Sequence, residues 1–545
     1  PHVFWNPVWY AGHPMRFSYV PLVPVLTALL GSLIGSFGRS YHLISGMAYM
    51  LVPVSLYVFM RSVTKNSWAA LVGALGFSLL PSLGNIFAEV RAAQGLFEAR
   101  TLPPWRMMVM VFYGEGPHTV ATVFLALAGL FFLQAMESGK HRFMVLAAVF
   151  LALTGLSNPI GLWAALVLAG AIIVVSLVWG RPLAATVKTS VTILILSYLF
   201  MAFWYTPGFI ASDFFKEGGG LLSTVLGYFP WRPAGVLLLF GGLLFVIRRV
   251  VASVATAVTM VWFAFTFFIV AVFYVWGVEF APQARRYIPE LDMAGATLLT
   301  IAVSKLTEAL KRKFRMPGWM IPLGAIAVIV VVSLPVWSAS RWFTSATNAP
   351  ATGPRERVVN AWLANNVGPA ERIFLSSNYS FWADLDTDVW QLRGGHWQAS
   401  INPWERHAGY QITNGQDEDI SLLWLKIFAI SKILVNGSGS SVHYRDFVYP
   451  QKFDGWPVAA CIVCPGDVVY RVPTPSRMAT AVAGEQAKRL VVPVNAVDHE
   501  ALSAYVSWLD RSPSVLSFTR EHNDRYIIKG NVGPGQDIRV AMSYD

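Results

Sequence analysis

The sequence predicts a polytopic α-helical membrane domain of about ten or eleven spans, followed by a mixed α/β domain that faces water. Of the 545 residues, 55% are hydrophobic, and the mean hydropathy is +0.52. Charged residues make up 13% of the chain, about half of the roughly 25% that is typical of soluble globular proteins. Apolar runs of about 20 residues, each long enough to cross the hydrocarbon core of a bilayer, recur between residues 20 and 338.

Residues 1–42 are expected to form the first loop on the outer side of the membrane. Residues 1–19 are rich in aromatic side chains and turn formers, and rings such as Trp5 and Trp9 suit the headgroup level. Residues 20–37 are apolar, but they also contain Pro21, Pro24, Gly31 and Gly35. They form either a span or a re-entrant segment. We favour the re-entrant segment because the prolines and glycines weaken a span.

The transmembrane domain is expected between residues 43 and 340. Asn158-Pro159 marks a tight break between two of its spans. The expected spans lie at about 43–60, 67–84, 119–136, 143–157, 160–179, 190–205, 234–247, 251–276, 290–304 and 319–338.

Loop charge sets the orientation, because short cytoplasmic loops carry an excess of Lys and Arg. Five short loops hold thirteen such residues, namely Arg61, Lys65, Lys140, Arg142, Arg181, Lys188, Arg248, Arg249, Lys305, Lys311, Arg312, Lys313 and Arg315. We therefore expect a multi-pass protein of the plasma (cytoplasmic) membrane with these loops in the cytoplasm. The long loops 85–118, 206–233 and 277–289 and the C-terminal domain are then extracytoplasmic. Since much of the net charge of +11 lies in the short loops, we exclude nucleic acid as a partner.

Residues 341–545 are expected to form the extracytoplasmic α/β domain. We expect strands near 372–375, 431–435, 467–472, 489–493 and 525–529, and helices near 354–366 and 498–510.

The sequence starts at Pro1 and stops inside a predicted strand, so we expect a fragment of a longer chain. Cys461 and Cys464 are its two cysteines, and they are compatible with a disulfide, with two thiols or, more weakly, with zinc binding.

Five short motifs resemble a set of prokaryotic membrane proteins. They are Phe4 to Pro14 (FWNPVWYAGHP), Tyr19 to Leu22 (YVPL), Tyr113 to His118 (YGEGPH), Pro282 to Glu290 (PQARRYIPE) and Asp388 to Gly395 (DVWQLRGG). The set is that of the 6-pyruvoyl-tetrahydropterin-synthase-related membrane proteins, a label that implies no pterin chemistry. It is similar to the GT-C superfamily of polytopic glycosyltransferases and to the YfhO-type membrane proteins.

The resemblance implies an inverting GT-C-like glycosyltransferase that moves a sugar from a polyprenyl-phosphate carrier to an envelope acceptor. Its partners would then be the lipid bilayer and a polyprenyl-phosphate-linked sugar. GT-C enzymes usually carry a catalytic Asp or Glu early in the first outer loop, and residues 1–42 contain neither. Either that carboxylate lies upstream of Pro1 or the protein lacks it. Two alternatives stay open: a non-catalytic or transport-type protein of cell-envelope polymer or lipid export, and a glycan-binding membrane scaffold.

Glu115 and His118 are the leading catalytic candidates, because sugar transfer needs a base to activate a weakly nucleophilic hydroxyl. They flank the start of a predicted helix at Gly116-Pro117, where free N–H groups attract anions. The alternative is a helix-start carboxylate favoured by the dipole and a histidine at the membrane interface. A divalent metal ion is a common supplement to this chemistry, and Glu115, His118 and Glu89 are its candidate ligands. For Glu89, a solvated or ion-paired surface position is the alternative.

Arg285 and Arg286 are the leading candidates for binding the phosphate, because they lie just outside a span against the inside-positive trend. The alternative for both is ion pairing with Glu279, Glu290 or Asp292. Arg106 is a further candidate for phosphate binding, and an interfacial anchor is its alternative. His13 is a candidate for assisting in the first loop, against a packed or solvated position among aromatic rings.

Overall fold

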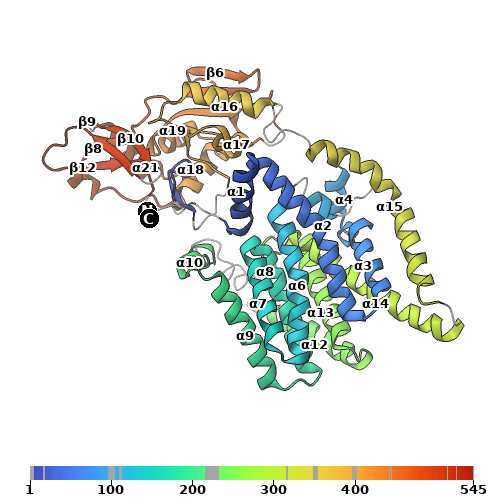
Figure 1. The fold of residues 1–545 in the computed structure, drawn as a ribbon. Coiled ribbons are helices and arrows are strands. Elements are labelled where there is room, and N and C mark those ends of the chain that lie inside the picture. Colours follow the sequence, from blue (N-terminus) through green and yellow to red (C-terminus); the bar gives the residue numbers. More distant parts are fainter. Residues whose placement is uncertain are drawn as a thin grey trace. The chain divides into compact units, whose positions relative to one another are not determined.

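The computed structural model describes two compact units. One unit contains Pro1–Tyr19 and Ala349–Asp545, and the other contains Val20–Asn348 (Figure 1). The described residues are all except 1–4, 16–18, 96–104, 110–112, 215–231, 315–316, 348–353, 396–399, 401, 441, 443–444, 512–513, 523–524 and 544–545. The division differs from the expected one, because the first nineteen residues belong with the C-terminal unit and not with a first loop of residues 1–42.

The second unit is helical, and every expected span corresponds to a helix. Its main helices are α1 (Leu22–Ile34), α2 (Phe37–Thr64), α3 (Ser67–Leu79), α6 (Gly116–Ser138), α7 (His141–Ser157), α8 (Pro159–Val178), α9 (Leu183–Met201), α12 (Arg232–Val250), α13 (Val254–Trp276), α14 (Ile288–Phe314) and α15 (Met320–Thr347). Shorter elements are η2 (Leu83–Ile86), α4 (Ala88–Gly95), α5 (Trp105–Met107), α10 (Pro207–Phe214) and η4 (Ala284–Tyr287).

Six helices of the described chain are long and apolar enough to cross a membrane, by length and composition: Phe37–Thr64, Gly116–Ser138, Pro159–Val178, Leu183–Met201, Val254–Trp276 and Ala284–Phe314. Shorter apolar helices occur at Leu22–Ile34, Ser67–Leu79, His141–Ser157 and Met320–Ser333. The fold class expected from the sequence, a polytopic helical membrane protein with a C-terminal α/β part, is confirmed.

The helix ends follow the expected local signals. Asn158 caps α8, since its Oδ1 accepts hydrogen bonds from the backbone N–H groups of Ile160 (2.9 Å) and Gly161 (3.0 Å), and Pro159 occupies the first turn. The turns that carry the Lys and Arg residues join α2 to α3, α6 to α7, α8 to α9, α12 to α13 and α14 to α15. The starts of α6 and α14 and the end of α13 therefore lie at the opposite end of the bundle (Figure 1).

Helices α3 and α14 approach each other closely at Gly73. A Cβ atom at this position would lie 2.9 Å from the backbone carbonyl oxygen of Ala296 and would overlap the side chain of Thr300. Gly73 and Thr300 are both buried in the helical unit. The absence of a side chain at Gly73 thus sets how closely these two helices pack.

The C-terminal unit is built on a five-stranded mixed sheet in the order β4-β3-β5-β7-β6. The strands are β3 (Arg372–Phe374), β4 (Trp390–Gln391), β5 (Ile430–Asn436), β6 (Val458–Val463) and β7 (Asp467–Arg471). Strand β3 runs parallel to β4 and β5, and the pairs β5–β7 and β6–β7 are antiparallel.

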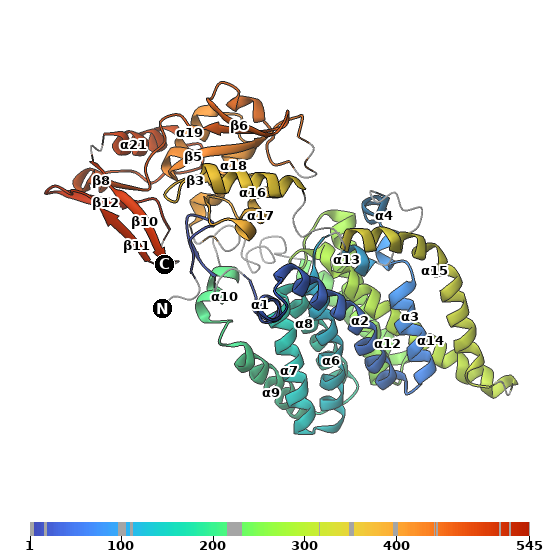
Figure 2. The same cartoon turned by 45° about the horizontal axis from the view of Figure 1, so that its top comes forward.

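Alternate residues of the sheet face two different layers of helices. Ile373 and Leu434 pack in one cluster with α16 (Pro354–Asn366) and α17 (Tyr379–Asp386). Phe374 and Ile433 pack in another cluster with α18 (Pro403–Asn414) and α19 (Glu418–Ile427), as expected for side chains that alternate along a strand. Figure 2 shows β3 and β5 with α16, α17, α18 and α19 beside them. The rest of the unit comprises β8 (Ala479–Ala483), α20 (Gly484–Ala487), α21 (His499–Asp510), β9 (Ser514–Val515), β10 (Ser517–His522), β11 (Arg525–Lys529), β12 (Gln536–Val540) and η6 (Pro450–Phe453).

The strand expected at 489–493 is wrong. These residues form no strand, and Val491 and Val492 are 71% and 69% exposed. An apolar run becomes a strand only if a neighbouring strand pairs with it, and Pro493 cannot donate the backbone hydrogen bond that such pairing needs. The other expected strands and helices of this unit are confirmed.

Residues 5–14 belong structurally to the C-terminal unit. Strand β1 (Trp5–Asn6) pairs with β2 (His13–Pro14). The backbone N–H of Gln391 donates to the Val8 carbonyl (2.8 Å), and that of Ser543 donates to the Ala11 carbonyl (2.8 Å). The Trp5 indole N–H donates to the Tyr526 hydroxyl (3.0 Å). The aromatic rings expected at a membrane interface therefore pack within a folded unit.

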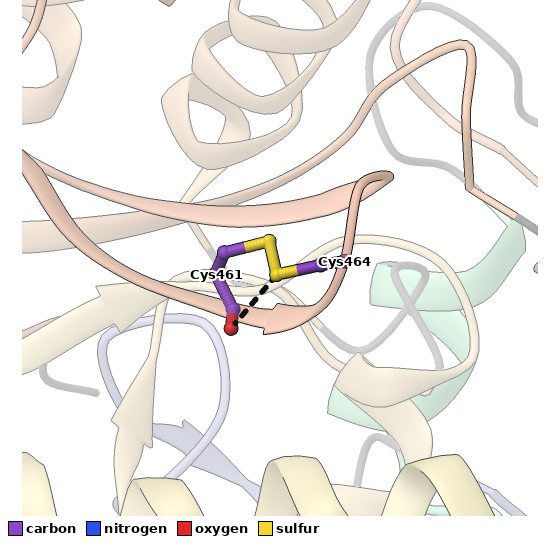
Figure 3. The surroundings of a disulfide bond; sticks show 2 residues. All are labelled: Cys461 and Cys464. Atoms are coloured by element: carbon purple, nitrogen blue, oxygen red, sulfur yellow. Dashed lines mark hydrogen bonds between the residues drawn. A yellow bond between two sulfur atoms is a disulfide. The ribbon is translucent and has the colours of Figure 1, made fainter.

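Cys461 and Cys464 are joined by a disulfide (Figure 3). Cys461 lies in β6, and Cys464 follows it in the turn that leads to β7. Of the three states that the spacing allowed, the structure shows the disulfide, so this pair is not a zinc site.

Asp384 gives the C-terminal unit an expected pH dependence. Burial raises the pKa of Asp384 to about 7, although Gln391 donates a hydrogen bond to its Oδ1 (3.3 Å). Between pH 4 and pH 7 the folded state retains a proton that the unfolded state has released, so stability falls as pH rises through this window. We expect the unfolding free energy to drop by on the order of 3 kcal/mol between pH 4 and pH 8 through this residue.

Hydrogen exchange of the α17 amides in the full-length protein, corrected for intrinsic rates, measures this effect. Asp384→Asn keeps the acceptor for Gln391 and removes the titration. It should therefore be more protected than the wild type at pH 8 and similar to it at pH 4. Equal pH dependence in both proteins would show that Asp384 is ionised in the folded state.

Candidate functional site

A cavity of about 450 Å³ lies where α6 and α14 begin and α13 ends. It is lined by Glu89, Val109, Tyr113, Glu115, His118, Phe273, Tyr274, Arg285 and Arg286. The structure thus brings together five of the residues that the sequence indicated, and they come from three separate segments of the chain. Their proposed roles stay predictions, but two carboxylates, an imidazole and two guanidinium groups share one cavity.

A tight turn places Glu115 at the start of α6. Gly114 adopts the left-handed conformation (φ 68°), which favours glycine, and the Tyr41 hydroxyl donates to its carbonyl (2.8 Å). The Glu115 N–H donates to the Val109 carbonyl (3.0 Å), and Pro117 occupies the first turn of the helix. The helix start expected from the Gly-Pro pair is therefore present, and the turn fixes where the Glu115 side chain originates.

Glu115 forms an ion pair with Arg286, with 2.8 Å between Oε1 and Nη1. The two side chains are 14% and 36% exposed, so the pair lies at the cavity surface. Arg286 lies in the 3₁₀ turn η4, where its N–H donates to the Gln283 carbonyl (2.8 Å). The expected alternative, in which Arg286 pairs with Glu279, Glu290 or Asp292, is wrong.

His118 forms a second and deeper pair with Glu290, with 2.7 Å between Nε2 and Oε1. Both side chains are buried, at 1% and 0% exposure. Within the described chain, His118 Nδ1, Glu290 Oε2 and the Tyr287 hydroxyl have no hydrogen-bond partner. The two pairs join the start of α6 to the start of α14, and the inner pair is fully enclosed.

The contact made by Glu290 could not be predicted from the sequence. The sequence suggested Glu290 as an ion-pair partner of Arg285 or Arg286, whereas in the structure it contacts His118, 172 positions away. The available signal was a carboxylate near the start of an apolar helix, which is costly in a membrane unless it is paired or functional. The identity of its partner depends on how the fold of the helical unit brings the start of α6 to the start of α14.

The cavity has a cationic side that is only partly neutralised. Arg285 is exposed and makes no ion pair within the part of the chain that the structure describes. Burial raises the pKa of the Tyr113 hydroxyl, and the nearby Arg285 guanidinium opposes part of that rise. The amino end of α6 adds the partial positive charge of a helix start. Glu89 and Glu115 also line the cavity, so the part suited to an anion is the side that carries Arg285 and the start of α6, not the cavity as a whole.

Arg106 does not line this cavity. Its Nη1 donates to the Tyr49 carbonyl (3.0 Å), and its guanidinium lies 3.9 Å from the centre of the Tyr49 ring. Together with His118 it borders a separate space of about 10 Å³, which is about the volume that one water needs. A phosphate does not fit in that space, and Arg106 does not line the larger cavity, so its phosphate-binding role stays a prediction that these contacts do not support.

His13 belongs to the C-terminal unit, not to the helical one. Its ring is 1% exposed and lies parallel to Trp9, with ring centres 6.3 Å apart. Its Nδ1 lies 3.4 Å from the Trp9 carbonyl oxygen. This is the packed alternative among aromatic rings, and an assisting role of His13 in the first loop stays a prediction.

The candidate metal ligands do not form a metal site. Among the described residues, no group of three or more His, Cys, Asp or Glu side chains is arranged to hold a metal ion. Glu115 and His118 are engaged with Arg286 and Glu290, and Glu89 is exposed. The residues present therefore do not fit the metal that Glu89, Glu115 and His118 were expected to bind, and we derive no step through one.

The C-terminal unit contains a second cavity of about 460 Å³. Apolar and aromatic side chains dominate its wall, including Trp404, Trp424, Tyr505 and Trp508, and Arg539 is its charged residue. No carboxylate or imidazole is among the described residues that line it. Because its described lining lacks a carboxylate or imidazole that could act as a general base near neutral pH, we place the candidate site in the helical unit.

Comparison with known proteins gives no family. No family model matches the chain, and no curated protein matches its sequence. Among solved structures, the chain is similar to apo ArnT from Cupriavidus metallidurans, at 13% identity and a TM-score of 0.43 over 84% of this chain and 88% of that chain. ArnT from the same organism bound to undecaprenyl phosphate gives 12% identity and a TM-score of 0.38 over the same shares. Both likenesses are too distant to transfer an activity, and the motif-based resemblance stays a prediction.

Proposed function

We propose that this chain is a membrane glycosyltransferase of GT-C type, which transfers a sugar from a polyprenyl-phosphate carrier to an envelope acceptor. One observation carries the proposal: a single cavity at one end of the helical bundle contains the Glu115 carboxylate together with Arg285 and Arg286. A base and a phosphate-binding wall are the two parts that such a transfer requires.

The reaction assigns a separate task to each side of the cavity. The acceptor hydroxyl attacks the anomeric carbon, a new C–O bond forms, and the bond between that carbon and the carrier phosphate breaks. Glu115 takes the hydroxyl proton, because its carboxylate is the more accessible base, at 14% exposure against 1% for His118. The departing phosphate keeps the electron pair, and Arg285 and Arg286 stabilise its charge. His118 positions α6 through its contact with Glu290.

The loop charges support an extracytoplasmic location for this cavity. The Lys- and Arg-rich turns lie at the opposite ends of α6 and α14, and such turns face the cytoplasm. In this proposal the protein is a multi-pass protein of the plasma membrane, and both the cavity and the C-terminal unit are extracytoplasmic.

Sugar transfer by the full-length protein tests the proposal. With a labelled polyprenyl-phosphate sugar and an envelope acceptor fraction, we expect Glu115→Gln to lower the rate about a hundredfold, because general-base catalysis contributes factors of this order. Glu279→Gln is the matched control, since Glu279 is exposed near the same end of the bundle but does not line the cavity.

Equal rates for the wild type and Glu115→Gln would remove Glu115 from the mechanism. No transfer by the wild-type protein, with every polyprenyl-phosphate sugar tried, would favour the transport-type or glycan-binding alternatives.

A further inference from the structure

The cationic wall of the cavity is partly occupied by one of the protein's own carboxylates. We infer that Glu115 is an internal anion which holds Arg286 until a phosphate group displaces it, so that phosphate binding and release of Glu115 are one exchange. The inference rests on the proposed function for the identity of the phosphate carrier, a lipid-linked sugar. The exchange itself requires only a ligand that bears a phosphate.

The position of Glu115 leaves its carboxylate dependent on Arg286. Glu115 is the N-cap residue of α6, but its side chain makes no capping hydrogen bond to that helix. A polar N-cap side chain normally accepts a hydrogen bond from the first turn. Here the carboxylate instead meets Arg286 Nη1 through one oxygen. A single contact of this kind, at a partly exposed position, is readily exchanged.

The arginine side of the pair is suited to receive a phosphate. Arg286 is 36% exposed at the cavity wall, and the adjacent Arg285 has no ion pair among the described residues. The turn after Gln283, which is in the left-handed conformation (φ 53°), holds both arginines on one short 3₁₀ element. A phosphate monoester has more charge than a carboxylate and three free oxygens, and the phosphodiester of a lipid-linked sugar has one charge and two free oxygens. Either group can contact both guanidinium groups where Glu115 contacts one.

The inner pair keeps the site in place during this exchange. His118 and Glu290 are 1% and 0% exposed, and they link the same two helices, α6 and α14. His118 borders the cavity, but Glu290 is not among the residues that line it, so a ligand in the cavity has less access to this contact than to the outer pair. The outer pair can therefore open while the start of α6 stays attached to the start of α14, and Glu115 is freed without movement of its helix.

The exchange makes the phosphate-bound state the one in which Glu115 is unpaired. While Glu115 contacts Arg286, one of its carboxylate oxygens is engaged with the guanidinium. Once phosphate has taken Arg286, that contact is broken and the Glu115 carboxylate is free to meet a ligand in the cavity. Arrival of the donor phosphate would thus release the carboxylate that the proposed transfer uses.

Binding measurements on the full-length protein in nanodiscs test the exchange. The probes are inorganic phosphate and polyprenyl monophosphate without a sugar. We expect Glu115→Gln to tighten binding about three- to tenfold, since the competing anion is gone, and Arg286→Gln to weaken it at least about tenfold. In the Arg286→Gln background, the added Glu115→Gln should no longer tighten binding. Glu279→Gln, which removes a charge outside the cavity, should leave affinity within about twofold.

Three results would overturn the inference. These are unchanged or weaker binding by Glu115→Gln, equal tightening by Glu115→Gln with and without Arg286, and no binding of either probe. If Glu115→Gln binds both probes more tightly, phosphate itself is the group that competes with Glu115. If it binds only polyprenyl monophosphate more tightly, the competing group is a lipid phosphate that the polyprenyl tail retains in the site.

The exchange and the proposed function can fail separately. If the exchange is observed but no sugar is transferred, the exchange stands and the glycosyltransferase proposal fails. If transfer depends on Glu115 but binding shows no coupling between Glu115 and Arg286, the glycosyltransferase proposal stands and the exchange fails.

Discussion

Replacing His118 by alanine is expected to destabilise the helical unit by about 3–5 kcal/mol, because it leaves Glu290 buried without its partner. Glu290 has 0% exposure, and its second oxygen already has no hydrogen-bond partner within the described chain. Removal of His118 would therefore leave the whole carboxylate unpaired in an enclosed position. Thermal unfolding of the full-length protein in one detergent measures the loss.

The double variant His118→Leu/Glu290→Leu distinguishes two effects: the destabilisation caused by an unpaired buried carboxylate, and the net stabilisation that the His118–Glu290 pair provides. Replacing both partners by apolar residues of similar size is often close to neutral, so we expect the double variant to regain most of the stability. Glu115→Gln is the matched comparison from the outer pair, with a loss of under about 1 kcal/mol because that pair is partly exposed. If the double variant were as unstable as His118→Ala, the His118–Glu290 pair itself would contribute net stability to the folded state, contrary to this prediction.

Replacing Gly73 by alanine is expected to destabilise the packing of α3 on α14 by about 3 kcal/mol. The new Cβ would meet the backbone carbonyl of Ala296 at 2.9 Å and overlap Thr300, and a backbone carbonyl cannot move aside as a side-chain tip can. The two helices would have to separate. Crosslinking between cysteines introduced on α3 and α14, together with thermal unfolding, measures the change.

Gly170→Ala provides the control for this substitution. Gly170 lies in α8, and a Cβ there would have no neighbouring atom within 4 Å. Alanine is the better helix former by about 1 kcal/mol, so this variant should be neutral or slightly more stable. A similar loss in both variants would point to a general intolerance of the helices to alanine, and not to the close approach at Gly73.

The helices could be predicted because their signals are local. The break at Asn158-Pro159 and the helix start at Gly116-Pro117 each depend on the chemistry of two or three adjacent residues, and both are present. Helix α16 begins and ends where its pattern indicated, at Pro354 and Asn366. The strand at 489–493 failed because its formation would have required a partner elsewhere in the chain.

The site was predicted as a set of residues but not as a set of contacts. Glu115, His118, Arg285 and Arg286 share one cavity, as their predicted positions on the same side of the membrane suggested. Their partners could not be derived, because each pair forms between α6 and the start of α14, more than 150 positions apart. The packed position of Arg106 was similarly hidden, since Tyr49 reaches it from α2. Pairing depends on helix packing, which periodicity alone does not specify.

Residues 5–14 belong to the C-terminal unit, and this restricts how many times the chain between them can cross the membrane. Ala11 accepts a hydrogen bond from Ser543, so both segments must lie on the same side of the bilayer. A chain that returns to its starting side has crossed an even number of times. Among the described helices, α2, α3, α6, α7, α8, α9, α12, α13, α14 and α15 correspond to the ten expected spans, and six of these helices are long and apolar enough to cross. If these ten cross and no other segment does, the total is even without α1, which agrees with the re-entrant segment predicted for residues 20–37.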